Sequence, residues 1–216
     1  MKFDPALIDK LRAELAKPLP GEKAQYRMAP PYRPNLTKEE IMKFNPRVSG
    51  VMLLLYEKDG LLNLVFTQRH SYAGVHSGQM SFPGGKKDEE DANLTETALR
   101  ETFEEVGVQR EEIELIGNLS ELYIPPSNFL VQPVVGFAAN TPVFHPHEAE
   151  VEKVVEIPVD FFLDKQNINY KTEITLVDNH KVTVPAYIFG RHIIWGATAI
   201  MLSEFTFILE QIINSK

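Results

Sequence analysis

The chain has 216 residues, 22 lysines and arginines against 30 aspartates and glutamates, and no cysteine, which gives a formal net charge of −8. A chain of this length is expected to form one domain, and its 44% hydrophobic and 24% charged residues are ordinary for a globular protein. The lack of cysteine excludes disulfide frameworks, thiolate metal sites and cysteine nucleophiles. An acidic chain is also a poor sequence-independent binder of nucleic acid, because neutralising phosphates requires clustered Lys and Arg.

The start of the chain bears on location. The segment Met1-Lys2-Phe3-Asp4-Pro5 carries an acid where a signal peptide would begin its apolar stretch, and no unbroken apolar run approaches the ~18 residues of a membrane span. These observations predict a cytoplasmic protein without a membrane partner.

Residues 1–45 are expected to form an N-terminal helical arm with a Pro-rich connector. A short amphipathic helix is predicted over residues 4–17, with Asp4 as N-cap and Pro5 in the first helical position. The spacing of Thr37 and Glu40 is that of a capping box before a brief helix near Ile41–Phe44. The main domain is predicted over residues 46–216.

The main domain opens with a predicted hairpin, formed by strands Val51–Tyr56 and Leu61–Thr67 around a turn at Asp59-Gly60. After a loop, a helix is predicted over Leu94–Val106, which ends at Gly107. Further strands are expected at Ile113–Leu119, Leu130–Ala138, Lys171–Leu176 and Val182–Phe189, the last two joined by a turn at Asp178-Asn179, and a final helix at Ala197–Ile213. This order predicts an α/β (α+β) fold with a mixed sheet between helices.

Three glutamates share one side of the predicted helix at Leu94–Val106. At ~100° per residue, Glu104 lies ~60° to one side of Glu101 and Glu105 lies ~40° to the other. Like charges at these spacings destabilise a helix, so the arrangement suggests a purpose such as binding divalent cations, which prefer carboxylate oxygens. Arg100 is placed to orient a carboxylate of this group.

The rest of the helix and the preceding segment fit such a site. The other face of the helix is predicted to anchor on the sheet through Leu94, Ala98, Leu99, Thr102, Phe103 and Val106. Gly84-Gly85, within the segment Phe82-Pro83-Gly84-Gly85, allows main-chain oxygens to approach a cation or phosphate closely.

The segment from Gly85 to Val108 resembles the signature of the Nudix hydrolases, which has the form Gly, five residues, Glu, seven residues, Arg-Glu-apolar-x-Glu-Glu-x-Gly-apolar. The matching positions of its second half are Arg100, Glu101, Glu104, Glu105, Gly107 and Val108. The first half is one residue longer here and has Asp91 in place of Glu. The resemblance implies a Nudix-like α/β/α sandwich and makes residues 46–216 a Nudix hydrolase domain.

The coenzyme A pyrophosphatase branch of this family is similar in its Phe-Pro-Gly-Gly-Lys segment, in an Asp at this spacing and in Thr-Ala-Leu-Arg-Glu. A preceding motif of that branch matches at Thr67, Arg69 and Gly78, whereas Gly74 stands where the branch has a second Arg. Likeness to the family extends from about Gly50 to Leu209.

The resemblance implies a Mg²⁺- or Mn²⁺-dependent diphosphatase that hydrolyses a small nucleoside diphosphate substrate such as coenzyme A or its derivatives, with 3′,5′-ADP and (acyl-)4′-phosphopantetheine as products. It implies catalytic roles for Glu101, Glu104 and Arg100, and metal ligation by Glu101, Glu104, Glu105 and the carbonyl of Gly85. Arg69, His76 and Glu150 are candidates for substrate binding, and Glu150 also for a metal ligand or base. Which carboxylate takes the proton from water stays open, as does a homodimer.

The sequence is also compatible with other functions and other residue roles. Hydrolysis of ADP-ribose, a dinucleotide or a nucleoside triphosphate is an alternative, and so is a binding module without catalysis. For His145 and His147 a polar loop is favoured over a phosphate site, and Trp195 could stack on an adenine but its place before an apolar helix favours the core. Tyr123, Pro125, Pro126 and Phe129 fit either a substrate pocket or packing.

Overall fold

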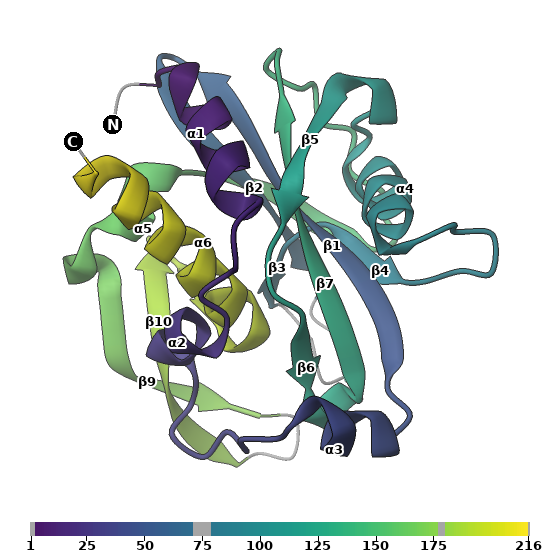
Figure 1. The fold of residues 1–216 in the computed structure, drawn as a ribbon, viewed down its shortest axis with the longest axis vertical. Helices are drawn as coiled ribbons and strands as arrows, with labels where there is room; N and C mark the ends of the chain where they lie inside the picture. The colour runs from purple at the N-terminus through teal and green to yellow at the C-terminus, as the bar shows by residue number, and fades with distance from the viewer. Residues whose placement is uncertain (1–2, 71–78, 177–179, 216) are drawn as a thin grey trace.

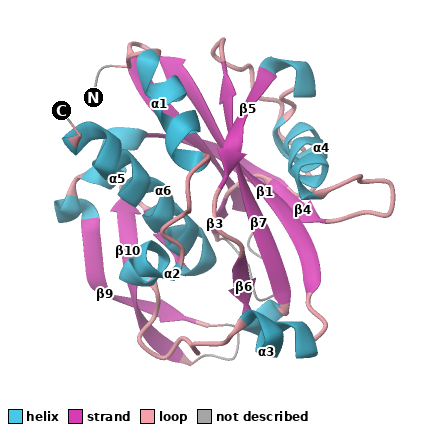
Figure 2. Cartoon of the chain, in the orientation of Figure 1, coloured by secondary structure: helices cyan, strands magenta, loops and turns pink. Residues whose placement is uncertain are grey.

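The computed structural model describes residues 3–70, 79–176 and 180–215. A mixed sheet forms its middle layer, with one long helix on one face and several helices on the other, as Figure 1 and Figure 2 show. A second, smaller sheet lies beside the C-terminal helix. The predicted sandwich of helices around a mixed sheet is confirmed.

The N-terminal arm consists of short helices. They are α1 (Ala6–Leu15), α2 (Glu22–Gln25), a 3-10 turn at Tyr26–Met28, and α3 (Lys38–Lys43). Asp4 Oδ1 accepts a hydrogen bond from Ala6 N at 3.0 Å, although α1 begins one residue later than predicted, with Pro5 in the N-cap position. At α3 the capping box is complete, because Thr37 Oγ1 accepts from Glu40 N while the Glu40 carboxylate accepts from Thr37 N.

Within the described residues, eight strands make the main sheet. They are β1 (Arg47–Lys58), β2 (Leu61–Arg69), β3 (Met80–Ser81), β4 (Gly84–Lys86), β5 (Ile113–Asn118), β6 (Leu122–Ile124), β7 (Phe129–Ala138) and β8 (Val151–Pro158). The central path runs β3-β2-β1-β7-β5, while β4, β6 and β8 pair with β1, β7 and β2 respectively. β1 and β2 form the predicted antiparallel hairpin, and β1 pairs parallel with β7 from Arg47↔Phe129 to Tyr56↔Ala138.

Helix α4 (Leu94–Val106) follows β4, and the short α5 (Val159–Leu163) follows β8. The second sheet has the order β11-β10-β9 and contains β9 (Ile168–Thr175), β10 (Lys181–Phe189) and β11 (His192–Trp195). The predicted turn at Asp178-Asn179 lies outside the described residues. The chain continues into α6 (Gly196–Asn214), and 3-10 turns occur at Arg110–Glu112, Pro125–Ser127 and Lys165–Asn167.

Two apolar cores lie on the two faces of the main sheet. The smaller core joins the sheet to α4 through residues such as Met52, Leu54 and Val106. The larger core joins the opposite face to α6 and to the N-terminal arm, whose Leu11 and Met28 are buried in it. The arm therefore shares the core of the main body, as burial of apolar surface requires for a segment this small.

Within the described part of the chain, α6 is the one helix long and apolar enough to span a membrane by length and composition. Two thirds of the relevant window is buried inside the protein, as is usual for a core helix. Its sequence includes Glu204, which is fully buried and hydrogen-bonded within the protein.

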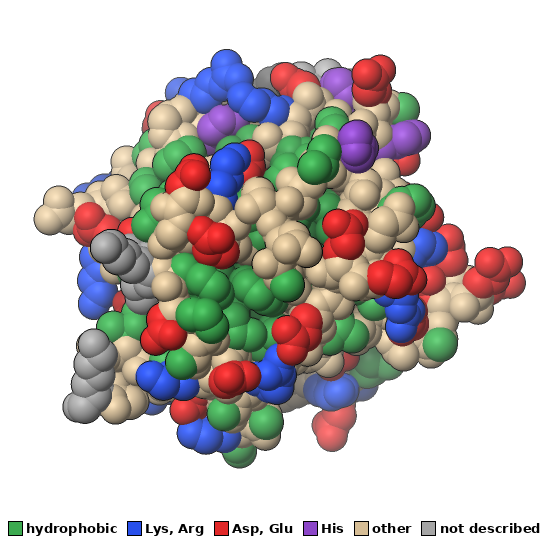
Figure 3. All heavy atoms as spheres, turned by 90° about the horizontal axis from the view of Figure 1, so that it is seen from above, with side chains coloured by type: hydrophobic (Ala, Val, Ile, Leu, Met, Phe, Trp, Pro, Cys, Tyr) green, Lys and Arg blue, Asp and Glu red, His purple; other side chains and the backbone are tan. Residues whose placement is uncertain are grey.

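Charged side chains are distributed over the surface. Figure 3 shows acidic and basic groups interspersed around a central apolar patch on the face seen from above. On this face the net charge of −8 is therefore not gathered into one acidic area.

Candidate active site

Helix α4 is fixed at both ends and along its length. Asn93 caps its start by accepting hydrogen bonds from Thr95 N at 2.9 Å and Glu96 N at 3.1 Å. Gly107 ends it in a left-handed conformation with φ of 78°. At Gly50 of β1 an added Cβ would lie 2.2 Å from the carbonyl oxygen of Leu94, so helix and strand backbones meet directly. The helix is therefore a rigid support for the side chains on its outer part.

Arg100 is the centre of an ion-pair network on α4. Its Nη1 lies 2.9 Å from Glu101 Oε1 and 3.1 Å from Glu104 Oε2. Its Nε and Nη2 each lie 3.0 Å from an oxygen of Asp91, and Nη2 also donates to Lys86 O at 3.1 Å. The guanidinium thus holds two helix carboxylates and the loop before the helix in one arrangement, as predicted for an orienting residue.

Asp91, which in the sequence stands out only as a departure from the family signature, is a site residue. It is buried, and besides Arg100 it accepts hydrogen bonds from Thr97 Oγ1 at 2.9 Å and Asp88 N at 3.0 Å. Its bonds with Arg100 lower the pKa of Asp91, and they raise the pKa of Arg100. The sequence signal for this role is the position of Asp91, nine residues before Arg100, where the family signature also has an acidic residue.

The carboxylate of Glu101 lies directly against the backbone of Gly85. A Cβ at position 85 would come within 2.4 to 2.5 Å of all three carboxylate heavy atoms of Glu101. Burial raises the pKa of Glu101, opposed by Arg100 and reinforced by the charges of Glu104 and Glu150. The structure therefore places Gly85 next to Glu101, and both are residues that the resemblance implies as ligands of a cation.

Glu105 lies beneath the helix and is only 3% exposed. Its Oε2 accepts a hydrogen bond from Gly84 N at 3.3 Å and lies 3.5 Å from Thr67 Oγ1, while its Oε1 lies 3.6 Å from Arg69 Nη2. Burial raises the pKa of Glu105 to about 7, although the positive charge of Arg69 and the Gly84 amide favour ionisation.

The predicted faces of α4 are wrong in two places. Glu104 has a side chain that is 54% exposed, so Glu104 and the buried Glu105 are not equivalent, and Phe103 is 47% exposed instead of packing on the sheet. The buried arc is centred near Thr102, which is fully buried. At ~100° per residue, Glu105 lies ~60° from Thr102 and is covered, whereas Phe103 lies ~100° away and is not.

The candidates for substrate binding are only partly brought together. Arg69 is half-buried beside Glu105 at the end of β2. Glu150 has a side chain that is 62% exposed and lies 3.7 Å from His147 Nδ1, yet its charge raises the pKa of both Glu101 and Glu105. His76, with Gly74 and Gly78, lies outside the described residues.

The donor set fits a hard divalent cation. Gly85 leaves a space that a Cβ would fill, next to the carboxylate of Glu101, and the neighbouring side-chain oxygens belong to Glu104 and Glu105. Among residues 3–70, 79–176 and 180–215, no three His, Asp or Glu side chains already stand as a ligand cluster. The carboxylates of Glu101 and Glu104 instead bond to Arg100, and that of Glu105 to Gly84 N.

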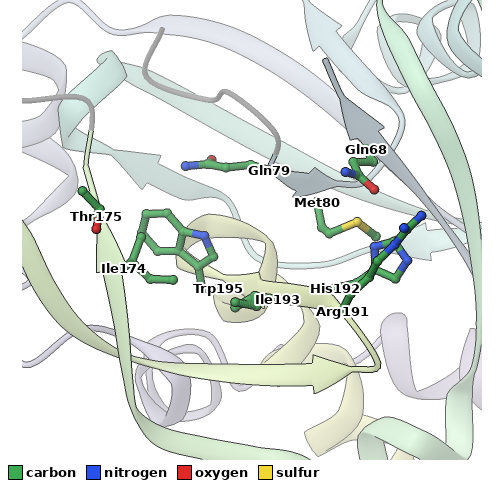
Figure 4. A pocket seen from close by; sticks show the side chains of 9 residues that line it. All are labelled: Gln68, Gln79, Met80, Ile174, Thr175, Arg191, His192, Ile193 and Trp195. Atoms are coloured by element: carbon green, nitrogen blue, oxygen red, sulfur yellow. The ribbon is translucent and has the colours of Figure 1, made fainter. Parts of the chain in front are cut away.

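Three other predictions concern the histidine segment after β7, Tyr123 and Trp195. The segment containing His145 and His147 packs against the end of α4, where His145 N donates to Val106 O at 2.9 Å and His147 N donates to Glu105 O at 3.1 Å. Tyr123 stacks on Phe44 of the arm and donates to Asn128 Oδ1 at 3.0 Å, so packing explains it. Trp195, for which the core was favoured, is instead partly exposed and lines a pocket, which Figure 4 shows.

Comparisons with known proteins agree with this geometry. The chain matches the NUDIX domain over residues 46–173. It is 34% identical over 166 residues to the human mitochondrial coenzyme A diphosphatase NUDT8, an alignment that covers 76% of this chain and 70% of that protein. It is 38% identical over 126 residues to the mouse peroxisomal coenzyme A diphosphatase NUDT7, with 58% of this chain and 52% of that protein covered.

A solved structure shares the fold. The crystal structure of a MutT/nudix family protein from Enterococcus faecalis superposes with a TM-score of 0.51 at 19% identity, over 97% of this chain and 76% of that one. The family match covers more than half of the chain and contains β1, the Gly84-Gly85 segment and all of α4. This chain therefore belongs to the Nudix family of pyrophosphohydrolases.

Proposed function

We propose that this Nudix hydrolase is a metal-dependent diphosphatase of coenzyme A or its derivatives, which it splits into 3′,5′-ADP and 4′-phosphopantetheine or its acylated form. The observation that carries the proposal is the carboxylate of Glu101, seated on the backbone of Gly85 and tied through Arg100 to Glu104 and Asp91. The choice of substrate is supported by the relatives from human and mouse, both of which are named coenzyme A diphosphatases.

The residues proposed to hold the cation are Glu101, Glu104 and Glu105, together with the carbonyl of Gly85. Mg²⁺ or Mn²⁺ would supply charge neutralisation for the diphosphate and lower the pKa of a coordinated water. Arg100 orients the carboxylates of Glu101 and Glu104 through hydrogen bonds of 2.9 and 3.1 Å. Asp91 in turn fixes Arg100 through two bonds of 3.0 Å.

The reaction needs one water molecule. Its oxygen forms a new bond to one phosphorus while the bond from that phosphorus to the bridging oxygen breaks, so each product keeps one of the two phosphates of the diphosphate. A carboxylate of the site accepts the proton of the attacking water, and its identity stays open among the glutamates. Arg69, beside Glu105, is placed to neutralise a phosphate oxygen, and Glu150 is close enough to affect both Glu101 and Glu105 electrostatically.

Hydrolysis of ADP-ribose, a dinucleotide or a nucleoside triphosphate is the second candidate function. It is favoured by one observation, namely that Gly74 replaces an Arg of the coenzyme A branch. A binding module without catalysis has less support, because such a module has no use for three clustered glutamates and their orienting Arg100. A cytoplasmic location and a homodimer stay predictions.

A substrate panel tests the proposal. Coenzyme A, acetyl-coenzyme A, ADP-ribose, a diadenosine polyphosphate and a nucleoside triphosphate are each incubated with Mg²⁺ or Mn²⁺, and products are identified by mass. We expect coenzyme A or its acetyl form to be split, and Glu104→Gln to lower turnover at least 100-fold without unfolding the protein. Glu111→Gln, an exposed acid beyond the end of α4, is the matched control and keeps full activity. If only ADP-ribose is split, the coenzyme A assignment is wrong, and if nothing is split, the binding module is favoured.

A further inference from the structure

A short turn at residues 147–151 leads into β8 and passes close to the candidate active site. Two backbone hydrogen bonds close it, from Glu150 N and from Val151 N to His147 O, both at 2.9 Å. At its start His147 N donates to the carbonyl oxygen of Glu105 at 3.1 Å, so the turn touches α4 at a glutamate of the site. We call this segment the 147–151 turn.

The turn enters β8 at an irregularity in the pairing of β8 with β2. The register is regular as far as Gln68↔Lys153, and it then shifts so that Arg69 is opposite Val151. Such a bulge interrupts regular pairing and re-aims the side chains next to it. Arg69 Nη2 lies 3.6 Å from Glu105 Oε1. The end of β2 and the start of β8 therefore meet beside the buried glutamate of α4.

His70, the residue after β2, ties the middle of the turn to that strand. Its Nε2 donates to the carbonyl oxygen of Glu148 at 2.8 Å, and because a carbonyl can only accept, Nε2 carries the proton in this contact. The register of β2 with β8 stops at Val151, so residues 148–150 lie outside it. His70 therefore supplies a side-chain anchor at a point that the backbone pairing of the sheet does not reach.

Glu150 is the charged group that the turn brings toward the site. Its side chain is 62% exposed and lies 3.7 Å from His147 Nδ1. Burial is the main reason that the pKa values of Glu101 and Glu105 are raised, and the negative charge of Glu150 raises both further. An additional negative charge beside the glutamates of α4 is unfavourable without a cation and becomes favourable when a divalent cation binds. The position of the turn thus determines how strongly this charge acts on the site.

We propose that His70 is a positioning residue, which holds the 147–151 turn so that the charge of Glu150 strengthens the binding of a divalent cation by the glutamates of α4. The inference rests on the proposed function, which includes that cation. The hydrogen bond can shift the turn between this position and any other by no more than its own free energy. Loss of the bond is therefore expected to weaken cation binding about fivefold, which equals about 1 kcal/mol.

Binding of Mn²⁺ without substrate tests the proposal. Metal-free wild-type protein, His70→Phe and His70→Gln are titrated with Mn²⁺ by isothermal calorimetry. Phenylalanine keeps a flat ring but has no donor, whereas the amide of glutamine can donate to the same carbonyl. We expect a Kd about fivefold higher in His70→Phe and within twofold of wild type in His70→Gln. An unchanged Kd in His70→Phe, equal weakening in both variants, or no binding of Mn²⁺ by wild-type protein overturns the proposal.

A double-mutant cycle shows whether His70 acts through Glu150. Glu150→Gln keeps the shape of the side chain and removes its charge, so it is expected to raise the Kd for Mn²⁺ at least fivefold. In that background His70→Phe should change the Kd less than twofold, because no charge is left to position. A further fivefold change in the double variant means that His70 acts independently of Glu150. That result overturns the proposal, as does an unaltered Kd in Glu150→Gln.

Thr141→Val is the matched control. Thr141 Oγ1 donates to the carbonyl oxygen of Glu57 at 2.8 Å, so it ties the other end of the same β7–β8 connection to β1. Glu57 pairs with Leu62 near the turn of the hairpin, whereas Arg69 and the site lie at the opposite end of β2. We expect the Kd for Mn²⁺ to stay within twofold of wild type. If Thr141→Val weakens binding as much as His70→Phe, any loosening of the connection has this effect and the role of His70 is wrong.

Turnover separates this inference from the proposed function. With coenzyme A as substrate, His70→Phe is expected to raise the Mg²⁺ concentration for half-maximal rate about fivefold, while kcat at saturating Mg²⁺ stays within twofold. If coenzyme A is not hydrolysed but the Mn²⁺ constants follow the cycle, the proposed substrate is wrong and the role of His70 stands. If coenzyme A is hydrolysed and the Mn²⁺ constants do not respond to His70→Phe, the role of His70 is wrong and the proposed function stands.

Discussion

Glu105 has its carboxyl group in a place where water cannot stabilise a negative charge. Its carboxylate is buried between α4 and β2, and its nearest polar partners are Gly84 N, Thr67 and Arg69. The sequence predicted three acids on one face of the helix, but the structure separates an exposed Glu104 from a buried Glu105. Helical spacing fixes the relative directions of side chains around the axis, whereas their burial depends on where the sheet lies.

The burial of Glu105 predicts a pH-dependent stability of the metal-free protein. Its pKa rises from an ordinary value of 4.5 to about 7, so the folded protein binds this proton more tightly than the unfolded chain. The resulting stabilisation is present below pH 4.5 and is lost as pH rises through 7, with a total of about 3 kcal/mol. Urea unfolding in chelator at pH 5 and pH 8 measures it, and Glu105→Gln is expected to abolish most of the difference. An unchanged pH dependence in that variant would contradict the assignment.

The substitution Gly85→Ala is expected to lower activity much more than stability. Gly85 does not have positive φ, so alanine is conformationally tolerated, but its Cβ would displace the carboxylate of Glu101. We expect Gly85→Ala to lose less than about 1 kcal/mol of stability, because a flexible side chain gives way, and to lose about 100-fold in turnover from the misplaced carboxylate. Thermal unfolding and steady-state kinetics on one preparation test this. Full activity would show that the closeness of Gly85 and Glu101 has no role.

At the level of helices and strands, the sequence predicted correctly those elements whose formation depends on interactions between residues close in the chain. The capping box at Thr37, the hairpin around Asp59-Gly60 and the helix from Leu94 to Val106 are all confirmed. β8 and β11 were missed for a physical reason. β8 carries Glu152, Lys153 and Glu156 among its apolar residues, and β11 has only four residues, so both depend on pairing with β2 and β10 rather than on their own propensity.

The packing of α4 on β1 predicts a severe effect of a small substitution. In Gly50→Ala the new Cβ would lie 2.2 Å from Leu94 O and 3.0 Å from Ala98 N, and backbone atoms of a helix cannot turn aside. We expect a loss of about 2–3 kcal/mol in the free energy of unfolding, as for overpacking. Gly60→Ala is the comparison, since its Cβ meets nothing within 4 Å and only its φ of 77° is unfavourable, so a loss of about 1 kcal/mol is expected. Equal losses would show that contact with α4 is not the cause.

For the whole molecule, Glu204 of α6 joins parts that are far apart in the sequence. Its fully buried carboxylate accepts hydrogen bonds from Gly21 N at 3.0 Å, Gln25 Nε2 at 3.0 Å and Ser120 Oγ at 2.6 Å. These donors lie on the N-terminal arm and on the connection between β5 and β6. No pattern in the sequence identified Glu204, because its partners are about 84 to 183 residues away and meet only in the folded chain.

Removing the charge of Glu204 is expected to weaken this junction. In Glu204→Gln one acceptor oxygen becomes an NH₂ group that faces backbone and side-chain donors, which leaves buried donors unpaired and costs about 1–3 kcal/mol. Glu210→Gln on the same helix breaks only the partly exposed pair with Arg27 and should cost less than about 1 kcal/mol. Chemical denaturation compares the two variants. Equal stabilities would mean that the Glu204 carboxylate does not hold the arm.

The parallel pairing of β1 with β7 has a consequence for the order of folding. Arg47 is in register with Phe129, so the central pair of the sheet joins residues that are separated by the hairpin, by α4 and by β5 and β6. Closing such a large loop costs chain entropy before any pairing energy is gained, and folds dominated by distant contacts fold in milliseconds to seconds. During synthesis the hairpin of β1 and β2 can form early. The other neighbour of β1, strand β7, is absent until Ala138 has left the ribosome. Until then β1 presents an unpaired edge of buried residues such as Leu53 and Leu55, and that interval is when the nascent chain is most exposed to aggregation.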